Sequence, residues 1–243
     1  MERLAALHPS NPTAPIGHTK RPIVTGTSVI AVKYADGVMM AADTLGSYGG
    51  LARFKDLRRI RAVGDFSLIG AGGEYSDFQH IMHVLEKTQV MDFCEDDGCI
   101  LGPENIHSYL TRVMYQRRNK GDPLYNSLLV AGVRDGEVFL GYVDNIGTAF
   151  KGDFITTGYG SHLALPHIRS NWKPGMSEAE ARTLLEDCMR TLYYRDCRTI
   201  NRLTFAKVTA SGPTVNEPVS LETKWNYASF VRPKAGADSD GSW

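Results

Sequence analysis

Thr27 follows Gly26 and opens an alternating apolar run, residues 27–33, of the kind found in a buried strand. A hydroxyl side chain directly after glycine at the start of such a strand is the arrangement of an enzyme that cuts its own chain. Cleavage of the Gly26–Thr27 bond would free an α-amine, which has an ordinary pKa of roughly 7.7–8.0 and suits a base at neutral pH. These residues therefore suggest nucleophilic catalysis by an N-terminal threonine, which also needs electrostatic support and an oxyanion donor. The alternative is that Thr27 is an ordinary β-branched residue that opens a strand.

Two short turns mark the strands that would position Thr27. Asp36-Gly37 follows the run that Thr27 opens, and Asp135-Gly136 interrupts a second, similar run. An Asp-Gly pair between β-rich runs is a strong hairpin signal, because both central residues of a type I′ turn need positive φ. We therefore predict two hairpins, with later strands over residues 203–210 and 215–221. Their apolar runs are nearly continuous in places, which indicates sheets that are covered on both faces.

Helices are predicted to cover the outer faces of these sheets. Apolar residues recur at spacings of three and four in three long segments, residues 76–90, 104–118 and 177–194. Ser177 and Glu180 fit a capping box at the start of the third helix, and a shorter helix is predicted after Gly160. Helix pairs outside two face-packed sheets make an α+β fold, a four-layer α-β-β-α sandwich.

The two ends of the chain carry no such periodicity. Residues 1–18 contain Pro9, Pro12 and Pro15 among small polar residues, and we interpret them as a leader or prosegment that is disordered or removed. We expect a single domain over residues 19–232 and a loose C-terminal tail over residues 233–243.

Composition excludes several classes of function. Lys+Arg and Asp+Glu number 27 each, so no overall field favours nucleic acid or an anionic membrane, and no apolar run approaches the roughly 20 residues of a membrane span. The four cysteines form no C-x-x-C pair, and we expect free thiols in a reducing compartment. We expect no cofactor and no metal: His80 and His83 lie three apart, but no ligand set accompanies them. The glycine-rich residues 70–73 lack the Lys-Ser/Thr of a phosphate loop.

Longer motifs resemble a known family. They are residues 25–29, 41–43, 45–49, 51–54, 70–73, 157–160 and 192–196. Together they resemble β-type subunits of the 20S proteasome, and the non-catalytic members in particular, over about Pro22 to Phe230. The resemblance implies the N-terminal nucleophile hydrolase type of sandwich.

The resemblance also implies a set of site positions around Thr27. Catalytic members carry an aspartate 16 residues after the nucleophile, which is Asp43 here, and a lysine 32 residues after it, where this chain has Arg59. Gly73 matches the candidate oxyanion glycine. Because a guanidinium group is broad and cannot be deprotonated in proteins, Arg59 cannot relay a proton as a lysine could.

Three further positions complete the comparison with catalytic members. Tyr159 stands where a serine is expected in a Gly-Ser-Gly turn, and we expect its ring to enter the space beside the α-amine. Asp196 matches the second aspartate, and Thr199 replaces the serine three residues after it. For Asp43 and Asp196, a structural network with Arg59 and Arg195 is the alternative to a catalytic role.

We therefore expect a degenerate site and a non-catalytic subunit. Members of a catalytic unit act together, and two of them are replaced here by Arg59 and Tyr159, while Thr199 is a near match to the serine. Two other functions stay open at this point, namely an active threonine endopeptidase that uses Thr27 and a free-standing amidase.

The resemblance implies other properties of the mature protein. It implies a 28-subunit core of four stacked rings, with other α and β subunits as partners, in ubiquitin-dependent protein degradation in the cytoplasm and nucleus. It also implies processing near Thr19 by an active neighbour, which leaves residues 19–26 across the site. A C-terminal arm that grips the facing ring is typical of the family, although residues beyond Arg232 do not clearly match.

Overall fold

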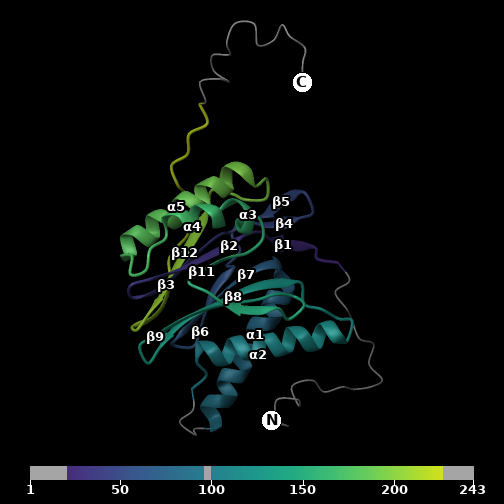
Figure 1. The fold of residues 1–243 in the computed structure, drawn as a ribbon. Helices are drawn as coiled ribbons and strands as arrows, with labels where there is room; N and C mark the ends of the chain where they lie inside the picture. Colours follow the sequence, from purple (N-terminus) through teal and green to yellow (C-terminus); the bar gives the residue numbers. More distant parts are fainter. Residues whose placement is uncertain (1–20, 96–99, 227–243) are drawn as a thin grey trace, which may run out of the picture.

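The computed structural model describes residues 21–95 and 100–226. Two antiparallel sheets lie face to face, and helices cover both outer faces (Figure 1). In that view α3, α4 and α5 lie above the sheets, and α1 and α2 lie below them. The predicted four-layer α-β-β-α sandwich is therefore confirmed. The predicted leader, residues 1–18, and the predicted tail, residues 233–243, lie outside the described residues.

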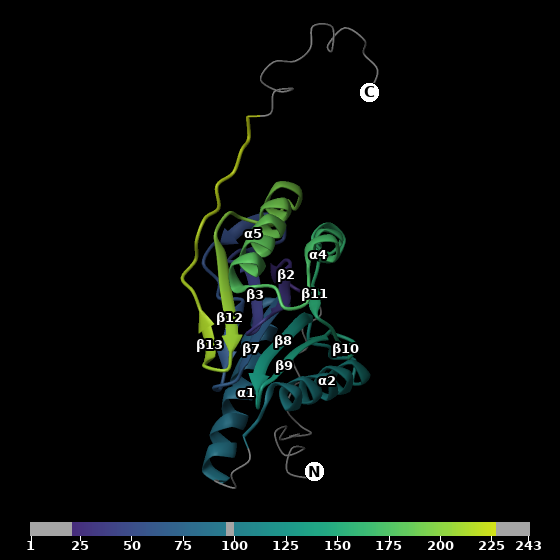
Figure 2. The ribbon, with the colours of Figure 1, turned by 60° about the vertical axis from the view of Figure 1, so that its left-hand side comes forward.

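The smaller sheet has five strands. Their order across the sheet is β11 (Phe154–Thr156), β2 (Val29–Tyr34), β3 (Gly37–Asp43), β12 (Leu203–Thr209) and β13 (Gly212–Val215). Figure 2 shows β13 beside β12 at one edge. The two central strands β2 and β3 are buried along almost their whole length, as their continuous apolar runs predict.

The larger sheet has eight strands. Seven follow in the order β10 (Ala149–Lys151), β9 (Glu137–Val143), β8 (Asn126–Arg134), β7 (Ser67–Glu74), β1 (Val24–Gly26), β4 (Gly46–Tyr48) and β5 (Leu51–Phe54). The eighth, β6 (Ile60–Val63), pairs with the first half of β7, and β1 pairs with its end. β6 and β1 thus lie along the same edge of β7, and Arg59, the residue before β6, lies between them.

The helices form where the apolar spacing predicts them. They are α1 (Tyr75–Glu95), α2 (Pro103–Asn119), α3 (Gly160–Leu163), α4 (Leu165–Asn171) and α5 (Glu178–Arg195). The predicted capping box is present, since the Ser177 hydroxyl accepts from the Glu180 amide and the Glu180 carboxylate accepts from the Ser177 amide. None of the helices in the described ranges is long and apolar enough to cross a bilayer.

Three apolar clusters fill the spaces between the four layers. One joins the smaller sheet to α4 and α5 through residues such as Ile30, Leu185 and Phe205. A second joins the larger sheet to α1 and α2, and a third, with Met40 and Leu129, lies between the two sheets. This core fixes both sheets, so the few polar groups between them have defined positions.

Two details of the predicted strands are wrong. The first hairpin turns on Ala35-Asp36, and Gly37 is already the first residue of β3, where a Cβ atom would lie 2.0 Å from the Val208 carbonyl oxygen. Glycine at position 37 is thus required for packing and not for turn conformation. The second hairpin does turn on Asp135-Gly136, and both residues have positive φ. In place of a strand over residues 215–221, the chain forms β13, followed by an isolated bridge from Val219 to Leu203.

Candidate functional site

Thr27 and Ser28 are the residues at which the chain passes from one sheet to the other. β1 belongs to the larger sheet and ends at Gly26, and β2 belongs to the smaller sheet and begins at Val29. Ser28 is buried and Thr27 is half-buried. The candidate nucleophile is therefore held by hydrogen-bonded strands on both sides.

The segment before Thr27 is a central strand. β1 pairs antiparallel with β7, where Gly26 lies opposite Gly73, and antiparallel with β4, where Thr25 lies opposite Ser47. Both edges of β1 are thus taken up by neighbouring strands. The expectation that residues 19–26 of the processed chain lie across the site stays a prediction.

The hydroxyl of Thr27 is bound to a carboxylate. Its Oγ1 atom donates to Oδ2 of Asp196 at 2.6 Å, and the same oxygen accepts from Oγ1 of Thr199 at 3.1 Å. Oδ1 of Asp196 accepts from the backbone amide of Arg198 at 2.9 Å. Asp196 is therefore part of a structural network, but these partners, and not the expected Arg195, hold it.

Arg59 is buried, and oxygen atoms surround its guanidinium group. Nε donates to the carbonyl of Asp43 at 2.9 Å, Nη1 to those of Thr27 and Ala71 at 2.9 and 3.2 Å, and Nη2 to that of Ser28 at 3.2 Å. Nη2 also donates to the Asp43 carboxylate. These bonds match the five N–H groups of an arginine, so each has an acceptor and none is directed to the Thr27 hydroxyl.

Asp43 and Arg59 form an ion pair that is almost completely buried. Burial raises the pKa of the Asp43 carboxyl, and the charge of Arg59 together with hydrogen bonds, including one from the Ile200 amide, opposes this effect. A buried pair of this kind is costly to break, because a single remaining charge would lack a partner. The expected alternative for Asp43, a structural network with Arg59, is the arrangement that the structure contains.

Gly73 has a structural reason to be glycine. Its φ is +91°, and a Cβ atom would lie 2.0 Å from the carbonyl oxygen of Tyr125. The neighbouring Gly72 is also constrained, though less severely, since its Cβ atom would lie 2.9 Å from the carbonyl oxygen of Thr27. The glycine match at position 73 is therefore explained by the backbone path, whether or not an oxyanion ever binds there.

The turn that contains Tyr159 contacts the site through its backbone. The amide of Gly160 donates to Oγ of Ser28 at 2.8 Å, whereas the Tyr159 residue is 60% exposed. This exposure does not place the ring relative to the Thr27 amine, so its expected position there stays a prediction. The turn positions Ser28, and only indirectly Thr27.

Three polar residues of this site were not predicted from the sequence. Ser28 accepts from Gly160, Thr157 accepts from the amide of Val29 at 2.8 Å, and the buried Glu74 carboxylate accepts from the amides of Ile23 and Val24, where the chain enters β1. Ser28 and Thr157 belong to motifs noted in the sequence, so their proximity to Thr27 was a usable signal. Nothing in the local sequence singles out Glu74.

The structure thus brings Thr27, Asp43, Arg59, Asp196 and Thr199 together at the crossing between the sheets. What it assembles is a hydrogen-bonded network in which the Asp196 carboxylate accepts from the Thr27 hydroxyl. Arg59 donates to the carbonyl oxygens of Thr27 and Ser28 and not to the Thr27 hydroxyl.

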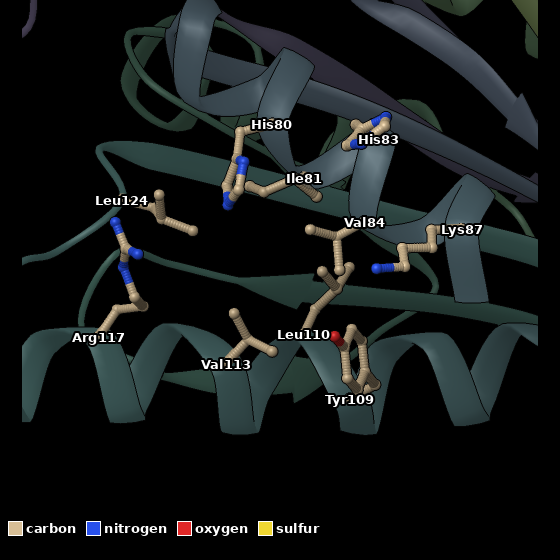
Figure 3. A pocket seen from close by; sticks show the side chains of 10 residues that line it. All are labelled: His80, Ile81, His83, Val84, Lys87, Tyr109, Leu110, Val113, Arg117 and Leu124. Carbon is tan, nitrogen blue, oxygen red and sulfur yellow. The ribbon is translucent and has the colours of Figure 1, made fainter. Parts of the chain in front are cut away.

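A pocket of about 200 Å³ lies elsewhere, between α1 and α2. Figure 3 shows His80, Ile81, His83, Val84 and Lys87 directed from one helix, and Tyr109, Leu110, Val113 and Arg117 from the other. Its lining shares no residue with the Thr27 network. Within the described part of the chain, no group of three or more His, Cys, Asp or Glu residues is arranged to hold a metal ion.

The chain is similar to known proteins of one family over most of its length. The family model described as proteasome subunit matches residues 23–208. The chain is 51% identical over 225 residues to proteasome subunit beta type-4 of Arabidopsis thaliana, with 93% of this chain and 91% of that protein covered. It is 45% identical to proteasome subunit beta type-4 of Xenopus laevis, covering 93% and 94%. It is 39% identical to proteasome subunit beta type-7 of Saccharomyces cerevisiae, covering 90% and 87%.

Proposed function

The chain belongs to the proteasome subunit family and is similar throughout to its β-type members, and we propose that it is a non-catalytic, structural subunit of the 20S core. In this role it shapes a ring and the proteolytic chamber, and it does not cleave peptides. Function resides in the site and not in the fold, so the proposal depends on the residues around Thr27.

The observation that carries the proposal is the hydrogen bonding of Arg59. A catalytic member needs a proton-carrying ammonium at this position, close to the nucleophilic hydroxyl. Here the side chain donates to four backbone carbonyls and to Asp43. It is occupied as a structural bridge, and a guanidinium cannot release a proton.

The position of β1 supports the same conclusion. Proteases generally bind a substrate chain in extended form, and main-chain pairing with a strand edge is one common mode. Next to Thr27, the edges of β7 and β4 are already paired with β1. The chain's own segment thus takes the place that an extended peptide would need in order to reach Thr27.

We also propose the assembly and location that go with this role. The partners are other α and β subunits in a 28-subunit core of four stacked rings, and the compartments are cytoplasm and nucleus. Gel filtration of the native protein tests the first point, since a monomeric or dimeric species would instead favour a free-standing amidase. Fractionation of cells tests the second.

The proposal is tested on core particles purified from their native source. An epoxyketone probe should label the catalytic neighbours, which serve as the internal positive control, and leave this subunit unlabelled. Mass spectrometry of the same sample should find an N-terminus upstream of Thr27, near Thr19. A probe adduct on Thr27 would instead establish the active threonine endopeptidase, the function favoured by the short Thr27–Asp196 hydrogen bond.

A further inference from the structure

Glu74 is a buried carboxylate at the end of β7, and it is not one of the positions at which catalytic members of the family carry site residues. Its Oε2 atom accepts from the backbone amide of Ile23, and from that of Val24 at 3.1 Å. Oε1 accepts from the hydroxyl of Ser76 at 3.0 Å. One carboxylate therefore binds two successive amides of the chain at the point where it enters β1.

The main chain of Glu74 is itself fixed by hydrogen bonds to residues 125 and 126, at the start of β8. Its carbonyl accepts from Nδ2 of Asn126 at 2.8 Å, and its amide donates to the carbonyl of Tyr125 at 2.9 Å. Glu74 also lies opposite Thr25 in the pairing of β1 with β7. The carboxylate is therefore fixed on a rigid strand, while the segment that it binds is short and only half-buried.

Exposure changes sharply at the residues that Glu74 binds. Arg21, Pro22 and Ile23 are exposed, whereas Val24 to Gly26 are half-buried and paired on both edges. A protease must take its substrate as an extended chain with free edges. Arg21 and Pro22 are exposed and accessible to such binding, but residues beyond Ile23 are not accessible unless β1 leaves the sheet.

We propose that Glu74 fixes the point at which proteolytic trimming of the N-terminal segment ends. Each cut adds one water molecule across a peptide bond and yields a new carboxylate and a new amine, with an active threonine endopeptidase of the assembled core as catalyst. The amides of Ile23 and Val24, bound to Glu74, withhold residues 23–26 from that protease. This inference rests on the proposed function, because an active subunit would release Thr27 itself.

Core particles that carry Glu74→Gln test the inference, with Glu86→Gln as the matched control. A glutamine keeps the shape of the side chain but has one oxygen for the amides of Ile23 and Val24 and the hydroxyl of Ser76. Glu86 is a half-exposed surface residue paired with Arg61, so its substitution leaves the N-terminal segment in place. The intact mass of the subunit from each particle gives its N-terminus.

The wild-type and Glu86→Gln subunits should begin upstream of Ile23. In Glu74→Gln, loss of charge-assisted bonds should raise the open population of the segment about tenfold or more. Chains that begin between residues 23 and 27 should increase by a similar factor. An unchanged N-terminus in an assembled Glu74→Gln particle overturns the inference.

A second pair of variants covers the case in which Glu74→Gln does not assemble. Ile23→Pro removes one amide that Glu74 binds, and Ile23→Ala keeps that amide and removes only an exposed side chain. The inference requires shortened chains and faster hydrogen exchange over residues 24–26 in Ile23→Pro and not in Ile23→Ala. A wild-type subunit that begins at Thr27 refutes the proposed function, whereas an upstream wild-type N-terminus with no effect of Ile23→Pro refutes only the role of Glu74.

Discussion

The Nη1 atom of Arg59 lies 2.9 Å from the carbonyl oxygen of Thr27. The side chain at the position of the catalytic lysine thus binds the backbone of the candidate nucleophile and not its hydroxyl. Arg59 also connects the two sheets at this point, because it donates to Asp43 at the end of β3 and to Ala71 in β7. Its role is to hold these oxygens together, and this role leads to the first prediction.

Replacing Arg59 should destabilise the chain without restoring catalysis. Arg59→Met leaves Asp43 as an unpaired buried charge and should lower the free energy of unfolding by about 3–5 kcal/mol. Arg59→Lys has three N–H donors for five acceptors and should lie between wild type and Arg59→Met. Urea unfolding of the full chain measures both, with Arg61→Met, which removes a surface ion pair, expected within about 0.5 kcal/mol of wild type. Probe labelling of Thr27 in Arg59→Lys would contradict the prediction.

The hydroxyl of Thr27 should matter for stability and not for peptide cleavage. Thr27→Ala removes the donor to Asp196 and should cost about 1.5–3 kcal/mol, the usual value for a hydrogen bond to a charged group. Thr27→Ser retains the donor and should unfold close to the wild-type midpoint. Core particles with either variant should hydrolyse fluorogenic peptides at the wild-type rate. A selective loss of one peptidase activity in both variants would show that Thr27 is a nucleophile.

Gly73 should tolerate no side chain. Alanine at this position has φ in the left-handed region and overlaps the Tyr125 carbonyl, and we expect a loss of about 2–5 kcal/mol. Gly121→Ala is the matched control: its φ is +67°, but no atom lies within 4 Å of the added Cβ. It should show only the strain, about 1–2 kcal/mol. Equal midpoints for the two variants in a urea titration would mean that the contact with Tyr125 is unimportant.

His107 should make the chain less stable in mild acid. Burial lowers the pKa of this imidazole, and the Lys151 charge lowers it further, against the Tyr142 carbonyl and Glu104. An unfolded histidine has a pKa of about 6.5. Below that pH the unfolded chain binds a proton at His107 that the folded chain excludes. The stability that the neutral His107 contributes above pH about 6.5 is therefore lost as the pH falls through the lowered pKa of the folded chain. The urea midpoint should fall between pH 7.5 and 5.5, and His107→Gln should flatten this slope; an equal slope would assign it to other groups.

The thiols should differ in reactivity. Burial, with a smaller effect of the Asp187 charge, raises the pKa of the Cys188 thiol to about 12, whereas Cys94 and Cys197 are exposed. Iodoacetamide attacks the thiolate, so the native chain should be alkylated at Cys94 and Cys197 and not at Cys188. Peptide mapping after labelling at pH 8 checks this. When the chain is unfolded in about 8 M urea, Cys188 should be alkylated as well. Early modification of Cys188 in the native chain would contradict the packing under α5.

The sequence predicted the layers well because apolar periodicity reports burial directly. The helices α1, α2 and α5 and the hairpin at Asp135-Gly136 follow from spacing and turn chemistry alone. The first hairpin was misplaced by one residue because Gly37 is needed where β12 approaches, which is a tertiary constraint. β13 was missed because Gly212 and Pro213 begin it and resemble a turn.

The sequence predicted which residues form the site, but it did not predict the contacts between them. The residues around Thr27 could be named from spacing and resemblance, yet the sequence cannot show that Arg59 has an acceptor for each of its N–H groups. It also cannot show that Tyr159 faces solvent, or that Asp196 is held by Thr27 and Thr199. Glu74 was missed because its partners are backbone amides 50 and 51 residues away, which leave no trace in side-chain type.

The place of β1 in its sheet has a mechanical consequence. β4 and β5 reach the rest of the larger sheet only through β1, which stands between β4 and β7. If the chain were cut after Gly26 and the upstream peptide departed, β4 and β5 would be left as a two-stranded ribbon, an element that is marginal on its own in water. An intact Gly26–Thr27 bond would thus anchor the hairpin of β4 and β5 to the rest of the larger sheet through β1.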